Sequence, residues 1–117
     1  MLKDKRSSFG VLARIRGLPD CTDELRYRLR ELVNLIQSRF GCLSCELIEN
    51  SRDSTEFTLL EEWSNEKAHY AQLRTEPIQK VMKAVRQLIS SELDNRRHVL
   101  QSNSVRYAAN SYCLAVG

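Results

Sequence analysis

The residue types best able to do chemistry in this sequence are cysteine and histidine, and two of the cysteines are closely spaced. The stretch C-L-S-C places thiols at Cys42 and Cys45. A CxxC pair can form a redox-active dithiol or, together with a second ligand pair, a zinc site. In the redox motif the cysteines open a helix, whose N-terminus lowers the thiol pKa. Here a helical pattern ends at Phe40, Gly41 is a typical helix stop, and the residues that follow indicate a β-strand.

The strand assignment argues against both kinds of site. Successive side chains of a strand alternate between its faces, so Cys42 and Cys45, three positions apart, are expected on opposite sides. Thiols placed in this way cannot share a metal ion or close a relaxed disulfide. Neither Cys21 nor Cys113 supplies a second pair at zinc-site spacing. We therefore predict that the motif is structural and that the chain holds no metal.

His69 is the preferred candidate for a general base. An imidazole titrates near neutral pH, so it can take a proton from a substrate under physiological conditions. A solvated or helix-capping histidine would fit the same position. His98 lies in a predicted strand, where a structural role is expected. Tyr70 and Gln72 lie on the same predicted helix as His69 and can either hydrogen-bond a substrate oxygen or serve as surface polar residues.

Trp63, the single tryptophan, ends a predicted strand. Its side chain is either a core anchor or a pocket wall that stacks on a flat substrate. Glu61 is two residues earlier and therefore shares a face of the strand with Trp63. A carboxylate beside an indole on an inward face is costly unless it is paired. We expect Arg14, from the first predicted strand, to be its partner.

The elements that must position these residues follow from hydrophobic periodicity. Residues 9–16 alternate and indicate a strand. A helix follows, with Asp20 or Thr22 as its expected cap. Its apolar stripe consists of Leu25, Leu29, Leu32, Val33, Ile36 and Phe40. The stretches CLSCELIEN and EFTLLEEW then indicate a β-hairpin closed by NSRDST.

The second half of the chain is predicted to contain two further helices and a last strand. Ser64 is expected to cap a short helix over NEKAHYAQL, and Pro77 to open the next helix. The apolar stripe of that helix consists of Ile78, Val81, Met82, Val85, Leu88 and Ile89, and RRHVLQS is the last expected strand. The order β-α-β-β-α-β predicts an α+β, ferredoxin-like fold with an antiparallel sheet and both helices on one face.

Length and charge limit the remaining possibilities. The 117 residues suffice for one domain at 9–101, between a charged segment at 1–8 and a partly apolar tail at 102–117. The bare sheet face predicts a homodimer, and the tail is expected to add a strand or lie across the partner. The net charge is only +3, and the basic residues are interspersed with acidic ones along the chain. This pattern is untypical of nucleic-acid binding. No apolar run could span a membrane, no secretory signal is visible, and we expect reduced thiols and a cytoplasmic location.

Several of these stretches resemble the antibiotic biosynthesis monooxygenase family. They are VLARI, DELRYRLREL, GCLSCELIEN and FTLLEEWSNEKAHYAQLRTEPIQKV, and the resemblance covers about residues 9–101. It implies a dimeric α+β barrel with a pocket between sheet and helices in each subunit. It also implies cofactor-independent oxygenation of quinols and polycyclic aromatics, or the binding and degradation of haem.

The resemblance can be carried over residue by residue. Trp63 falls at the family's tryptophan, while the family's frequent histidine falls on Gln72, one turn after His69. Residues three apart on a helix share a face, so His69 could reach the same pocket. Cys45 stands where members often carry tyrosine. In the haem-degrading branch an asparagine and a histidine occupy the places held here by Arg14 and Met82, so we expect no haem.

Two functions follow as hypotheses. The first is a cofactor-independent monooxygenase that uses O2 and a small aromatic substrate, a quinol or a polycyclic aromatic phenol. In it His69 is the catalytic base, and the expected substrate contacts are Trp63, Gln72, Tyr70, Arg14 and Glu61. The sequence shows no nucleotide or phosphate motif, so the electrons would come from the substrate. The second is a non-catalytic dimeric barrel that binds an apolar ligand or serves as an assembly module.

Overall fold

The computed structural model describes the backbone of residues 7–101 and the side chains of residues 8–90. Its elements are β1 (Ser7–Gly17), the 3₁₀ turn η1 (Pro19–Cys21), α1 (Thr22–Gln37), β2 (Cys42–Glu49), β3 (Glu56–Trp63), α2 (Glu66–Leu73), α3 (Glu76–Arg86) and β4 (Ile89–Gln101). The expectations for the tail at 102–117 and for most of the segment at 1–8 lie outside the described residues.

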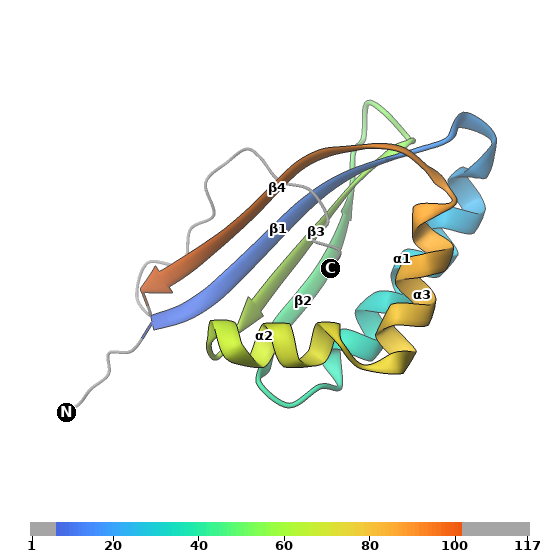
Figure 1. Ribbon diagram of the computed structural model, residues 1–117. Coiled ribbons are helices and arrows are strands. Elements are labelled where there is room, and N and C mark those ends of the chain that lie inside the picture. The colour runs from blue at the N-terminus through green and yellow to red at the C-terminus, as the bar shows by residue number, and fades with distance from the viewer. Residues whose placement is uncertain (1–6, 102–117) are drawn as a thin grey trace.

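The strands form one antiparallel sheet, in the order β2-β3-β1-β4. This is the predicted ferredoxin-like β-α-β-β-α-β arrangement. Figure 1 shows the strands as a twisted sheet, with α1 and α3 side by side and α2 near the end of β3. No helix within the described residues is long and apolar enough to cross a membrane.

The core lies between the sheet and the helices. Every second residue of β1 and β3 is buried against them, including Val11, Ile15, Phe57 and Leu59, each at most 1% exposed. These side chains meet the predicted stripes of the two longer helices, of which Leu25, Leu29, Leu32, Val33, Ile36, Ile78, Val81, Met82 and Val85 are buried. Burial of large aliphatic and aromatic side chains contributes about 1.5–3 kcal/mol each and holds the layers together.

The ends of the helices differ from the predictions. α1 ends at Gln37, so Phe40 lies beyond it and is 89% exposed instead of belonging to the stripe. Neither Asp20 nor Thr22 caps α1, because a 3₁₀ turn leads into it and Cys21 occupies the cap position without a side-chain hydrogen bond.

The remaining boundaries also shift. Asn65, rather than Ser64, caps α2, and its side chain accepts a hydrogen bond from the Ala68 N–H. Pro77 lies in the first turn of α3, as predicted. α3 ends at Arg86, so Ile89 belongs to β4, which begins well before the expected residue 96.

The turn between α1 and β2 depends on Gly41. Its φ angle of 90° lies in the left-handed region, which side chains other than glycine disfavour. A Cβ atom at this position would lie 2.7 Å from the Cβ of Ala68 on α2. The turn therefore joins the start of β2 to α2 at a contact that leaves no room for a side chain.

We predict that Gly41→Ala lowers the free energy of unfolding by about 1–3 kcal/mol, through backbone strain and overpacking against α2. Urea unfolding followed by circular dichroism measures the change. Ser44→Ala, at an exposed position of β2, is the control and should shift the value by less than about 0.5 kcal/mol. Equal stability of the two variants would contradict the role assigned to this turn.

Candidate functional site

His69 lies in an aromatic enclosure between α2 and one end of the sheet. Its side chain is 2% exposed. The ring centroids of Phe9 and Trp63 are each 5.5 Å from that of His69, and the centroid of Tyr70 is 5.1 Å away. Phe9 and Trp63 are paired across β1 and β3, so the sheet presents both aromatic rings on the helix-facing side. Sequence reasoning missed Phe9, although its spacing of two residues from Val11 places both on the same, buried face of β1.

Glu61 supplies the charge of this enclosure. It is 4% exposed and accepts a hydrogen bond of 2.7 Å from the Trp63 indole Nε1 through Oε1. The same oxygen lies 3.6 Å from Nδ1 of His69. Glu61 and Trp63 therefore share a face of β3, as predicted, and the indole N–H offsets part of the desolvation of the carboxyl group.

Arg14 does not pair with Glu61, contrary to the prediction. Its Nε and Nη2 atoms donate to Oε2 of Glu56 at 2.9 and 2.7 Å. Arg14 lies between Ala13 and Ile15, which face the helices, so alternation turns its side chain to the other face of the sheet. The arginine therefore lies outside the His69 enclosure.

Tyr70 and Gln72 lie on α2 with His69, and they differ in their surroundings. The Tyr70 ring contacts both His69 and Phe9. Gln72 is half-buried, and its Oε1 is enclosed without a hydrogen-bond partner among the described residues. The side chain of His98 lies outside the described residues.

Both ring nitrogens of His69 are likewise buried and lack a hydrogen-bond partner within the described part of the chain. An unsatisfied buried polar group costs about 1–3 kcal/mol. Native proteins keep few such groups, and they occur where a ligand or water completes the hydrogen bonding. The unsatisfied atoms of His69 and Gln72 therefore mark the inner side of α2 as the candidate site.

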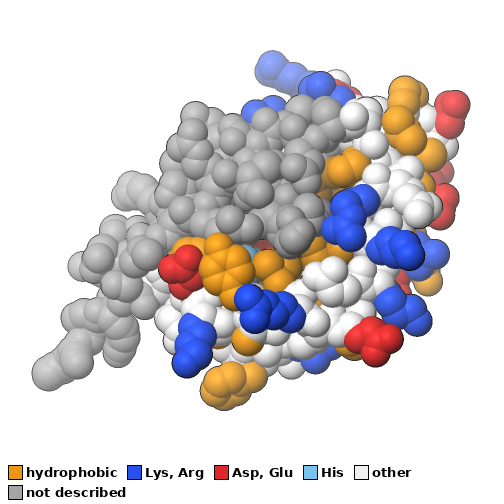
Figure 2. All heavy atoms as spheres, in the orientation of Figure 1, with side chains coloured by type: hydrophobic (Ala, Val, Ile, Leu, Met, Phe, Trp, Pro, Cys, Tyr) orange, Lys and Arg blue, Asp and Glu red, His pale blue; other side chains and the backbone are white. Residues whose placement is uncertain are grey.

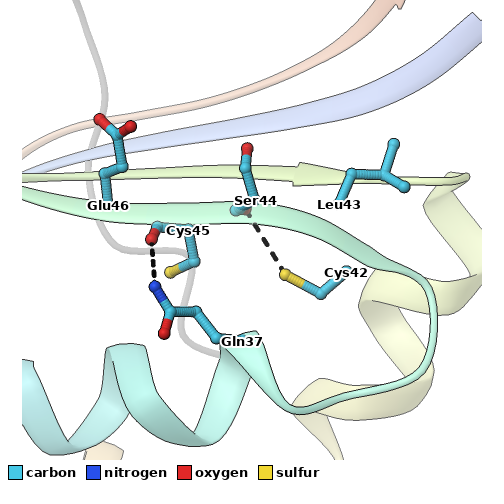
Figure 3. Close-up of a pocket in the computed structure, with 6 residues that line it drawn as sticks. All are labelled: Gln37, Cys42, Leu43, Ser44, Cys45 and Glu46. Atoms are coloured by element: carbon cyan, nitrogen blue, oxygen red, sulfur yellow. Dashed lines mark hydrogen bonds between the residues drawn. The ribbon is translucent and has the colours of Figure 1, made fainter.

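The two thiols of β2 point to the same side of the strand, and the prediction of opposite faces is wrong. Figure 3 shows Cys42 and Cys45 directed towards Gln37 of α1, while Ser44 and Glu46 point away. The reason is a register shift between Cys42 and Ser44, a bulge that adds one residue and reverses the alternation. The six residues drawn in Figure 3 line a cavity of about 360 Å³ at this edge of the sheet.

These thiols are poorly suited to nucleophilic or redox chemistry. Burial, reinforced by the nearby Glu61, raises the pKa of Cys42 to about 11. Burial raises the pKa of Cys45 further, with smaller contributions from Glu61 and Cys42. A neutral thiol is a weak nucleophile. Within the described residues, no group of three or more histidine, cysteine, aspartate or glutamate side chains could hold a metal ion.

The comparisons with known proteins agree with this fold. The model of the antibiotic biosynthesis monooxygenase family matches residues 8–101. The chain belongs to this family. A search of curated proteins gave no match.

Solved structures share the fold. A Chloroflexus aurantiacus protein described as a putative antibiotic biosynthesis monooxygenase is 25% identical, with a TM-score of 0.71, covering 79% of this chain and 91% of that one. A Pseudomonas aeruginosa protein is 22% identical, with a TM-score of 0.73, covering 87% and 100%. SnoaB, a cofactor-independent oxygenase from Streptomyces nogalater, is 11% identical, with a TM-score of 0.67, covering 85% and 95%.

We predict that Cys42 resists alkylation in the folded protein. At pH 8 a thiol of pKa about 11 is ionised in about one molecule in 1,000, whereas a free thiol is ionised in about one molecule in four. Because only the thiolate reacts, labelling of Cys42 by iodoacetamide should be about 100-fold slower or more in the folded protein. Because the folded pKa exceeds the unfolded one, this thiol stabilises the fold below about pH 8.5, and that contribution is lost as the pH rises towards 11.

Peptide mass spectrometry after timed labelling measures the rate at each cysteine. The urea-unfolded chain provides the reference rate for the same residues. Labelling of Cys42 in the folded protein at the unfolded rate at pH 8 would show that the thiol is not desolvated.

Proposed function

We propose that this protein is a cofactor-independent monooxygenase that oxidises a quinol or a polycyclic aromatic phenol. The observation that carries the proposal is the buried imidazole of His69, whose ring nitrogens lack a partner among the described residues. The aromatic rings of Phe9, Trp63 and Tyr70 around it suit a flat aromatic substrate. The family to which the chain belongs is named for monooxygenases, and the structurally similar SnoaB is a cofactor-independent oxygenase.

In the proposed reaction His69 takes the proton of a phenolic hydroxyl group. The resulting phenolate transfers one electron to O2, and the substrate radical and superoxide combine at a ring carbon that bears hydrogen. The peroxide anion takes the proton back from His69, and the resulting hydroperoxide loses water, which leaves one oxygen atom on the substrate as a carbonyl. Proton removal by a positioned base contributes about 10²–10⁴-fold to the rate. A dry enclosure keeps the radical pair from side reactions with water.

The other side chains have supporting roles in this proposal. Trp63 and Tyr70 form walls for the aromatic substrate, and the unsatisfied Oε1 of Gln72 accepts a hydrogen bond from it. Substrate entry requires α2 to move, because His69 is closed off from solvent. His69 is also the only fully buried residue of α2, so this helix is the one most easily displaced from the core.

Two observations favour the alternative, a non-catalytic barrel that binds an apolar ligand. The His69 side chain is 2% exposed, and the place of the family's usual histidine holds Gln72. A barrel that only binds ligand would keep the aromatic enclosure without needing proton transfer. Turnover distinguishes the two functions.

We predict that the protein consumes O2 with at least one member of a panel of quinols and hydroxylated polycyclic aromatics. His69→Gln, which keeps a similar volume, should lower the turnover number by about 100-fold or more. Tyr27→Ala, at a position 65% exposed on α1, is the control and should retain full activity. Oxygen-electrode assays measure both. Equal activity of His69→Gln and the natural chain would reject His69 as the base, and no activity with any substrate would favour the binding barrel.

We further propose that the protein is a homodimer in which the helix-free faces of two sheets pack together. This face carries apolar residues, including Leu12, Leu60 and Ile48, beside the Arg14–Glu56 ion pair. Members of the family are typically dimeric. On the face drawn in Figure 2, the basic and acidic side chains are interspersed, a pattern that is untypical of a nucleic-acid-binding surface.

We predict a mass of two chains, or a multiple of two, in light scattering at micromolar concentration. Leu12→Asp introduces a charge on the proposed interface and should shift the mass towards one chain. Tyr27→Asp, at an exposed position of α1 on the helix side of the sheet, is the control and should keep the dimer. A mass of one chain for the natural protein would contradict this assembly.

A further inference from the structure

We propose that Glu61 is a positioning residue that holds His69 in the tautomer with its proton on Nδ1, so that Nε2 is the basic atom. The role of Nε2 in taking a substrate proton rests on the proposed function. The tautomer itself is a property of the chain alone and can be measured without any substrate.

The hydrogen bond from Trp63 holds the carboxyl oxygen in place. An indole N–H can only donate, so Oε1 of Glu61, 2.7 Å from Nε1, must act as an acceptor. Glu61 and Trp63 are two residues apart on β3 and both are at most 4% exposed, so the strand and the core limit the movement of this oxygen. Oε1 is therefore an acceptor with a defined position beside His69.

The position of Oε1 decides which ring nitrogen carries the proton. Oε1 lies 3.6 Å from Nδ1, and this contact is too long for a hydrogen bond but close enough for a strong electrostatic effect in a buried site. A proton on Nδ1 faces the acceptor favourably, whereas a lone pair on Nδ1 would face another lone pair. The neutral ring therefore keeps Nδ1–H and leaves its lone pair on Nε2.

The same arrangement supports the charged state of the base. When Nε2 takes a proton the ring becomes an imidazolium, and a neighbouring carboxylate stabilises that charge. Among the side chains that the structure describes, the titratable groups beside His69 are Glu61 on β3 and Tyr70 on α2, while its other ring contacts, Phe9 and Trp63, carry no charge. Cys45, opposite Glu61 on β2, stays neutral because burial raises its pKa.

Nitrogen NMR of the ¹⁵N-labelled full chain tests the proposal directly. Imidazole nitrogens with and without a proton differ strongly in chemical shift, and the His69→Gln spectrum identifies the signals of His69. In the natural chain, at a pH where the ring is neutral, we expect the proton on Nδ1 and an unprotonated Nε2. A proton found on Nε2 would overturn the proposal, whatever any variant does.

Two variants separate the carboxylate from its surroundings. Glu61→Gln keeps the shape and an accepting oxygen for Trp63 but removes the charge, so the ratio of the Nδ1–H to the Nε2–H form should fall about tenfold. Glu61→Asp should restore part of the ratio. Glu62→Gln is the matched control and should change nothing, because Glu62 pairs with Ser8 on the other face of the sheet. An unchanged ratio in folded Glu61→Gln would also reject the proposal.

The same variants keep this inference distinct from the proposed function. If turnover is found, Glu61→Gln should lower the turnover number with little change in KM. An Nδ1–H tautomer that depends on Glu61, in a protein that oxidises no quinol, would support the positioning role and reject the monooxygenase. Turnover by a protein whose His69 carries its proton on Nε2 would support the monooxygenase and reject the positioning role of Glu61.

Discussion

The register between β1 and β3 is the constraint on which the candidate site depends. It pairs Phe9 with Trp63 and places both on the helix-facing side, together with Glu61. The same alternation sends Arg14 and Glu56 to the opposite face, where they form their own ion pair. Because the side-chain period of a strand is two, a slip of one residue would exchange the two sets. The pairing of β1 with β3 therefore specifies both the apolar core and the aromatic enclosure around His69.

The aromatic enclosure around His69 contains buried polar atoms, which lower stability in an otherwise apolar core. Glu61 is stabilised by the Trp63 indole N–H, but the ring nitrogens of His69 have no hydrogen-bond partner among the described residues. Stability is lower at such a position, and proteins tolerate this where the unsatisfied group has a function. α2 has His69 as its only fully buried residue, so the helix that carries the proposed base is also the one least tied to the core.

Patterns that repeat along the chain predicted much of the fold, and local departures from them limited the rest. Helical spacing predicted the stripes of α1 and α3, and alternation placed Glu61 beside Trp63. One extra residue in β2 defeated the same rule for Cys42 and Cys45. Arg14 was assigned by charge complementarity, although alternation with Ala13 and Ile15 would have excluded it. The burial of His69 could not be predicted, because apolar and polar residues are nearly evenly spread around the short α2.

The central claim is that a buried His69 takes a proton from a phenol bound beside Trp63. Anaerobic absorption spectroscopy with a hydroxyanthraquinone tests it most directly, because the neutral phenol and its anion have different visible spectra and no oxygenation can follow. The account predicts that binding below the pKa of the free phenol produces the anion spectrum, and that His69→Gln binds the same molecule in its neutral form. Binding to the natural chain with the spectrum of the neutral phenol would contradict the account.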